Sequence, residues 1–90
     1  VQFLNSATSI TTSITTLTNG AWVIDSVGSG NAGVGFTPLA AGQTERYDVA
    51  TGDSAGAGST LYVANSGVVS LGWSQGANRL AHVLAAFAPA

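Results

Sequence analysis

The sequence predicts an all-β protein, an antiparallel β-sandwich. Short runs rich in threonine, isoleucine and valine alternate apolar and polar residues, as strands with one buried face do. Glycine, asparagine and serine separate these runs at intervals near ten residues, which is typical of sandwiches. No linker or exact internal repeat divides the chain, so residues 1–90 should form a single domain or the C-terminal part of one.

The N-terminal region is predicted to contain two strands separated by a turn. Val1–Leu4 is a short apolar piece, Asn5–Thr8 a polar turn, and Ser9–Thr18 a strand dense in β-branched residues. Ile10 and Ile14 share parity, with threonines between them, so this strand should have one apolar and one polar face.

The dipeptide Asn19-Gly20 predicts a type I′ hairpin turn, because both central residues of that turn need a positive φ. The turn would lead into a strand over Ala21–Val27. Apolar residues on both faces of this strand predict a central place in the sheet. One face carries Trp22 and Ile24, and the other carries Val23 and Asp25.

The middle of the chain is predicted to be rich in loops. Its elements are a glycine-rich loop (Gly28–Gly35), a strand break at Thr37-Pro38, a turn (Ala40–Gly42), a strand (Gln43–Ala50), a loop of small residues (Thr51–Ser59) and a strand (Thr60–Ala64). The strand Gln43–Ala50 carries most of the charge. Glu45, Tyr47 and Val49 lie on one of its faces, and Thr44, Arg46 and Asp48 on the other.

The C-terminal region begins with a turn at Asn65–Gly67 and a strand over Val68–Ser74, whose Val69, Leu71 and Trp73 should face inward. A polar turn over Gln75–Asn78 would follow. Arg79–Ala88 allows either helix or strand, because leucine and alanine favour helices. As a strand it would place Ala81, Val83, Ala85 and Phe87 on one face, and Leu80, His82 and Leu84 on the other.

The composition narrows the possible partners. Charged residues make up 7% of the chain, against roughly 25% in soluble domains, and the net charge of -2 opposes association only weakly. The absence of a basic patch argues against nucleic acids and anionic membranes. The absence of cysteine excludes disulfides and thiolate metal sites. No apolar run is long enough to predict insertion into a membrane.

One motif could indicate catalysis. Gly72–Gly76 reads GWSQG and matches G-x-S-x-G, the strand–turn–helix elbow that presents the nucleophilic serine of α/β-hydrolases. Ser74 would be the nucleophile and His82 its only downstream base. No acid follows Ser74, and ninety residues cannot build the parallel sheet that carries the elbow. We therefore expect no enzyme and no catalytic residues, and keep a serine-hydrolase fragment as an alternative.

Other candidate sites are weaker. Asp25, Asp48 and Asp53 could supply oxygen ligands to calcium, but they lack the spacing of known calcium loops. His82, as a lone histidine without cysteines, cannot build a zinc site and is expected at a surface or interface. The glycine-rich loop has no lysine with which to bind phosphate. We therefore expect no metal and no cofactor.

The aromatic residues divide into two groups. Strand parity predicts that Trp22 and Trp73 belong to the core. Tyr47 and Tyr62 are freer, and could stack on sugars as aromatics in binding modules do. Glycans are therefore possible ligands, and a carbohydrate-binding module is a second alternative.

Several stretches resemble a known family. GQTERYDV, a loop of small residues, an apolar–Gly–Trp-Ser strand and a closing strand ending in Pro-Ala are similar to the C-terminal half of a jelly-roll or concanavalin-like β-sandwich domain. That domain occurs in secreted bacterial surface proteins and phage structural proteins. VQFLNSA and AWVIDSV resemble its mid-domain and central strands. The resemblance implies a non-enzymatic module whose first half is missing here, so that another chain would complete the sandwich.

Together these observations predict a non-catalytic structural module of an extracellular or virion assembly. Its role would be surface display, adhesion or self-assembly through open β edges, which template further pairing. The expected partners are other protein chains, either copies of itself or a missing upstream half. The expected location is extracellular, on a cell surface or in a virion.

Overall fold

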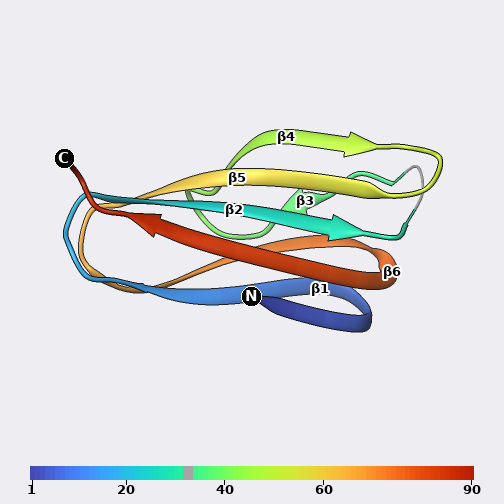
Figure 1. The fold of residues 1–90 in the computed structure, drawn as a ribbon, viewed down its shortest axis with the longest axis horizontal. Coiled ribbons are helices and arrows are strands. Elements are labelled where there is room, and N and C mark those ends of the chain that lie inside the picture. Colours follow the sequence, from blue (N-terminus) through green and yellow to red (C-terminus); the bar gives the residue numbers. More distant parts are fainter. Residues whose placement is uncertain (32–33) are drawn as a thin grey trace.

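The computed structural model describes residues 1–31 and 34–90, and these residues form β-strands and connections (Figure 1). The strands are β1 (Gln2–Thr16), β2 (Ala21–Ser29), β3 (Thr37–Pro38), β4 (Thr44–Ala50), β5 (Ala55–Val63) and β6 (Gly67–Phe87). All of them belong to one open antiparallel sheet in the order β1-β6-β2-β5-β4, with β3 added to β6. The all-β antiparallel prediction is confirmed, but a two-sheet sandwich or jelly roll is not. Across the described ranges no helix is long and apolar enough to cross a bilayer.

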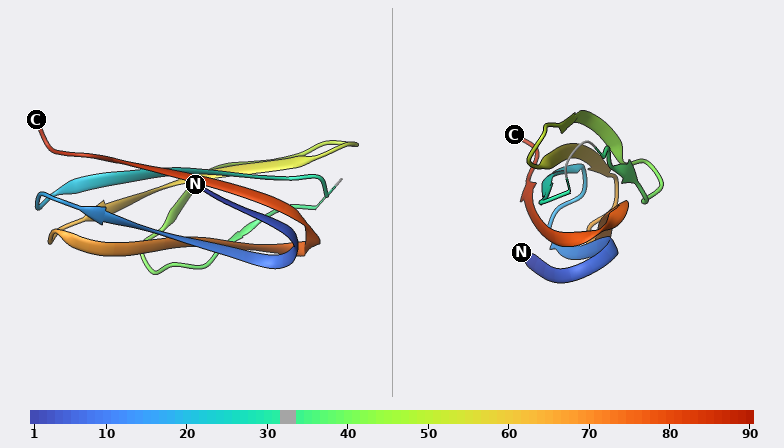
Figure 2. Two further views of the ribbon diagram at one scale, coloured as in Figure 1. Left: turned by 60° about the horizontal axis from the view of Figure 1, so that its bottom comes forward. Right: turned by 90° about the vertical axis from the view of Figure 1, so that its right-hand side faces the viewer.

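Two long strands bend and curl the sheet (Figures 1 and 2). The first half of β6 pairs with β1 between Ser9 and Thr16, and its second half pairs with β2 from Leu80 to Phe87. Register shifts in β1 between Leu4 and Ser9 lie where both strands bend, as β-bulges do. Figure 1 shows β6 running to one end of the molecule, bending and returning.

Two of the predicted turns are wrong. Asn5–Thr8 and Gln75–Asn78 lie within β1 and β6, because a bulged strand can change direction without leaving the sheet. The ambiguous segment Arg79–Ala88 is strand up to Phe87. The helix that a nucleophile elbow requires is therefore not formed after Ser74.

The predicted hairpin at Asn19-Gly20 is also wrong. β6 lies between β1 and β2, so these strands are not neighbours. Gly20 has a φ of 77°, but no other residue type among those described has a positive φ, so Asn19 cannot complete a type I′ turn. Instead the Gly20 amide donates to the carbonyl of Val63 at 2.9 Å, and Asn19 Oδ1 accepts from the Ser66 amide at 2.8 Å. The connection crosses the end of the sheet and is fixed to the one between β5 and β6.

The segment Thr51–Ser59 is not a loop throughout, because β5 begins at Ala55. Its small residues have a packing role. Ala57 is fully buried in the core, and the ring of Tyr47 lies so close above Gly58 that a Cβ would not fit. The sequence signal for a loop came from residues that the sheet needs to be small.

The connection from β2 to β4 is partly as predicted. Residues 32–33 of the predicted loop Gly28–Gly35 lie outside the described part, and Gly28 and Ser29 belong to β2. Thr37-Pro38 forms a two-residue strand beside β6, where a prediction of no strand was wrong, since proline is tolerated at a sheet edge. The Ala40–Gly42 turn is confirmed, and Gln43 Oε1 accepts the amides of Ala40 and Gly72, each at 3.2 Å.

The curled sheet has two arms: β1 with the first half of β6, and the second half of β6 with β2, β5 and β4. The core lies between these two arms. Leu71, from the first half of β6, packs on Val23 of β2 and on Leu61 and Val63 of β5, although β6 meets β2 only through its other half. A second cluster surrounds Trp73; its other buried members are Ile10, Val27, Phe36, Ala55, Ala57 and Leu80. The predicted inward positions of Leu71 and Trp73 in β6 are confirmed.

Candidate functional site

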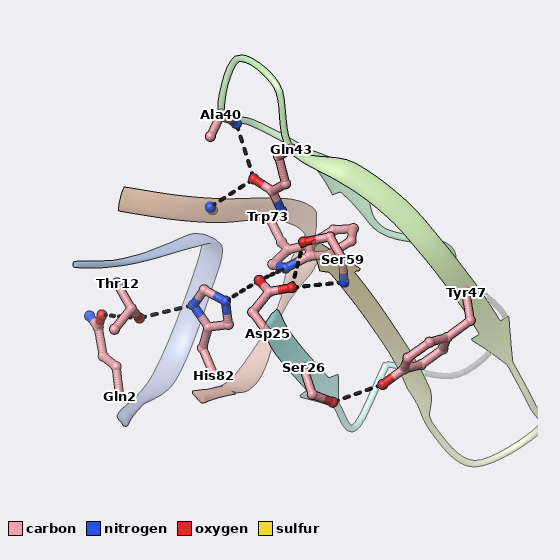
Figure 3. Close-up of polar contacts among 11 residues, drawn as sticks. Gln2, Thr12, Asp25, Ser26, Ala40, Gln43, Tyr47, Ser59, Trp73 and His82 are labelled. Atoms are coloured by element: carbon pink, nitrogen blue, oxygen red, sulfur yellow. Dashed lines mark hydrogen bonds and ion pairs between the residues drawn. The ribbon is translucent and has the colours of Figure 1, made fainter. Parts of the chain in front are cut away.

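The inside of the sheet holds a cluster of hydrogen-bonded polar side chains around Asp25 (Figure 3). Asp25, on β2, is 4% exposed and faces the core. Its Oδ1 accepts from the backbone amide of Ser59 at 2.8 Å and from the Ser59 hydroxyl. Its Oδ2 accepts from Trp73 Nε1 at 2.7 Å and from His82 Nε2 at 2.6 Å. Strands β2, β5 and both halves of β6 therefore meet at one carboxylate.

The cluster continues from His82 toward the strand β1. The His82 side chain is fully buried, so the prediction of a surface or interface position was wrong. Its Nδ1 lies 2.9 Å from Thr12 Oγ1, and the Thr12 hydroxyl is 3.1 Å from Gln2 Oε1. Asp25, His82, Thr12 and Gln2 thus form a continuous chain of hydrogen bonds from the core to the half-buried inner side of β1.

The surroundings of Asp25 favour its ionised form. Burial alone would raise its pKa, but the hydrogen bonds from His82, Ser59 and Trp73 lower the pKa by more, and the net pKa lies below the usual 3.8. A buried carboxylate is tolerated only when donors satisfy it, and here four donors point at its two oxygens. The cluster is therefore a satisfied ionic centre within an apolar core.

The order carboxylate–imidazole–hydroxyl is the arrangement that activates a nucleophile in hydrolases. Here the hydroxyl is that of Thr12, which already contacts both His82 and Gln2. The imidazole is fully enclosed by the protein. The geometry therefore fixes the relative positions of β1, β2 and β6 around a buried imidazole.

Ser74 lies within the continuous strand Gly67–Phe87, paired with Ser9 on one side and Thr37 on the other. His82 lies eight positions further along the same strand, and both of its ring nitrogens are occupied by Asp25 and Thr12. The structure thus brings His82 to an acid, but to Asp25 across the sheet and not to Ser74.

Sequence reasoning missed the partnership between Asp25 and His82. It placed Asp25 on the same face of β2 as Val23, and His82 on the same face of β6 as Leu80. Both apolar neighbours are buried. An acid and the single histidine that both face a core need hydrogen-bond partners there, and each can serve as the partner of the other. The alternation of the two strands therefore contained this signal. Thr12 and Ser59 carried no such signal.

The outer face of the sheet carries exposed aromatic side chains. Tyr47 and Tyr62, the predicted ligand-binding residues, are 47% and 55% exposed. The ring of Tyr62 lies 5.3 Å from that of Trp22, at an interplanar angle of 58°. Trp22 is itself 45% exposed, so its predicted place in the core was wrong. The Tyr47 hydroxyl is 2.8 Å from that of Ser26, across β5.

The three aspartates considered for calcium have separate roles. Asp25 belongs to the buried cluster, Asp48 accepts the backbone amide of Phe36 at 3.1 Å, and Asp53 is exposed beyond β4. Within residues 1–31 and 34–90, no three histidine or acidic side chains come together as metal ligands.

Comparisons with known proteins give no family. No family model, curated protein or solved structure matches this chain.

Proposed function

We propose that this chain is a non-catalytic structural module of an extracellular or virion assembly, which joins other chains through an open β edge. The observation that carries the proposal is the free edge of β1. Among residues 1–31 and 34–90, this strand pairs only with β6, so its other edge has no partner there from Gln2 to Thr16, and none of its residues is charged. Unpaired edges of this kind template pairing with further strands.

The other edge of the sheet is protected. β4 pairs only with β5, but it carries Glu45, Arg46 and Asp48 and has a register shift between Glu45 and Tyr47. Charges and bulges are the devices by which proteins block edge-to-edge pairing. Arg46 donates from Nε to the Thr60 hydroxyl at 2.9 Å. Both edge strands have register shifts, but only β4 is charged, and this difference makes β1 the edge that would accept a partner.

The partner would be a further copy of this chain or an upstream half of the same domain, which would complete a jelly-roll sandwich. The low charge of the chain supports association, since little repulsion opposes it. The extracellular or virion setting, and roles in display or adhesion, follow from the resemblance to surface and phage proteins.

The test is the size of the purified chain, measured by light scattering after gel filtration and by negative-stain imaging. Thr15→Lys places a charge on the exposed edge strand, and Thr18→Lys makes the same change just beyond it. We expect regular particles or filaments from the natural chain and from Thr18→Lys, and their loss in Thr15→Lys. Assemblies that survive Thr15→Lys would exclude the edge of β1 as the joining surface.

A carbohydrate-binding module is the second candidate, because Tyr47 and Tyr62 are exposed on one face. It requires saturable binding on a glycan array, lost in Tyr62→Ala or Tyr47→Ala and kept in Val68→Ala, which alters an exposed residue of the other arm. No binding by the natural chain would exclude this candidate.

A further inference from the structure

The outer face of β5, β2 and the second half of β6 has an aromatic ridge at one end. Trp22 is paired with Tyr62 of β5 on one side and with Phe87 of β6 on the other. These three side chains are between 45% and 55% exposed. Figure 1 shows their strands side by side. We call this row, Tyr62, Trp22 and Phe87, the ridge.

The same face has a groove at its other end. Gly28 of β2 is paired with Gly56 of β5 and with Ala81 of β6. These three small residues form the floor of the groove. Val49 and Phe3 stand at its two ends, paired with Gly56 and Ala81. A shallow groove of about 310 Å³ lies there, and its outward-facing lining includes Phe3, Ser26, Gly28, Ala81 and Val83. A Cβ on Gly28 would meet no atom within 4 Å, so the space above it is open.

We propose that this face binds a second copy of the same chain, with the ridge of each copy seated in the groove of the other. Trp22 and Gly28 lie six residues apart on β2, roughly 20 Å along a strand. A two-fold axis that lies in the interface, perpendicular to the strands and between Ile24 and Ser26, exchanges these two ends. Such an axis makes one surface complementary to itself, as an isologous dimer requires.

The charge and the area of the face fit a copy of this chain. The outward residues of β2, of β5 from Gly56 and of β6 from Ala81 include no charged side chain. On β4 the same face carries Arg46, whose Nε binds the Thr60 hydroxyl at 2.9 Å, so little charge opposes the approach of a second copy. Half of what an aromatic side chain can bury is roughly 100 Å². Among eight large exposed side chains, the five aromatic ones therefore offer on the order of 500 Å². The three aliphatic ones extend this area toward the roughly 800 Å² per partner of a standard interface. The eight are Phe3, Trp22, Ile24, Tyr47, Val49, Tyr62, Val83 and Phe87, each 45% to 75% exposed.

The ring geometry favours a protein partner over a glycan. The rings of Trp22 and Tyr62 are tilted by 58°, so they do not form one flat platform on which a sugar ring could stack. Tilted rings interdigitate with side chains. Two sheets packed through this face would also form a sandwich, the architecture that the sequence predicts.

The dimer rests on the proposed structural function, but it uses the face and not the edge of the sheet. Trp22→Thr removes the centre of the ridge and keeps a strand-forming residue. Gly28→Leu fills the groove while adding apolar surface. Val68→Thr is the matched control, because Val68 is 70% exposed on the other arm of β6.

Sedimentation equilibrium, with circular dichroism to confirm folding, decides between the outcomes. With Thr15→Lys added to every variant to block assembly through the edge of β1, we expect the chain and its Val68→Thr variant to form dimers. Trp22→Thr and Gly28→Leu should raise the dissociation constant roughly tenfold or more. Stronger association of Gly28→Leu would show unspecific hydrophobic contact and overturn the proposal, as would a monomeric natural chain. The proposal would also be overturned if the monomeric natural chain bound a glycan and Trp22→Thr abolished that binding. Thr15→Lys should leave the dimer intact, so that failure of the edge and failure of the face are measured separately.

Discussion

The two faces of β2 invert the usual distribution of residues. Its inward face buries Asp25 between Val23 and Val27, while its outward face exposes Trp22 and Ile24 to about half of their surface. Charged residues are almost never fully buried unless paired, and large apolar residues usually lie inside. The strand shows that position in a sheet is decided by available partners as much as by hydrophobicity.

The two faces differ in whether their residues find partners within the chain. On the inner face, donors from Ser59, Trp73 and His82 surround the Asp25 carboxylate and compensate its loss of water. On the outer face, Trp22 has Tyr62 beside it but no cover. The inner face is complete within one chain, whereas the outer face is the part that a second chain would cover. Substitutions on the two faces should therefore have different consequences.

The largest effect is expected from Asp25→Ala. It would leave the indole of Trp73 and the imidazole of His82 without an acceptor in the core, and it would open a cavity. Breaking a buried pair in this way costs about 3–5 kcal/mol of the free energy of unfolding. Urea denaturation followed by tryptophan fluorescence would measure the loss.

Asp53→Ala is the control for Asp25→Ala, because Asp53 is exposed in the connection after β4. It should change the free energy of unfolding by no more than about 0.5 kcal/mol. Equal effects of the two substitutions would show that the buried cluster contributes nothing particular to stability.

Acid should destabilise the chain through the same carboxylate, with a smaller effect. The pKa of Asp25 in the folded chain lies below its usual 3.8, so the unfolded chain binds the proton more tightly. The contribution of Asp25 is complete above pH 3.8 and is lost as the pH falls through the lower pKa of the folded state. Denaturation curves between pH 5 and acid values below that pKa would show the decline.

Glu45 acts in the opposite direction. Desolvation and the neighbouring Asp48 raise its pKa above 4.5, so its protonation favours the folded chain as the pH falls through that raised pKa. Because Glu45 is exposed, this contribution should be weak. The variant Glu45→Gln should therefore retain the acid destabilisation. A stability independent of pH in Glu45→Gln would contradict the role of Asp25.

Local patterns predicted much of this fold. Period-two alternation placed Leu71 and Trp73 on the inward face of their strand, and both are buried. Apolar residues on both faces of β2 predicted its central place, between β5 and β6. Alternation reports which face of a strand is buried, and it does so wherever one face meets a core.

Long-range features could not be predicted in the same way. The bends of β1 and β6 resemble turns in sequence, because bulged residues and turn residues are both small and polar. The crossing from β1 to β2 carries Asn19-Gly20, yet the strand order is decided by β6, far along the chain. The contact of Thr12 with His82 depends on this curl, so the composition of the buried cluster emerges only in three dimensions.

Matched threonine substitutions on the two faces of β2 should have unequal effects. Val23 is fully buried, and Val23→Thr places a hydroxyl among Leu61, Val63 and Leu71, where no acceptor has been left for it. The cost should be about 1–3 kcal/mol of the free energy of unfolding. Ile24 is 47% exposed, and Ile24→Thr keeps a β-branched residue, so it should cost no more than about 0.5 kcal/mol. Both are measured by urea denaturation at protein concentrations low enough to keep the chain monomeric. If Ile24→Thr were as costly as Val23→Thr under these conditions, the outer face would already be part of the folding core, and its exposed residues would no longer need a second chain.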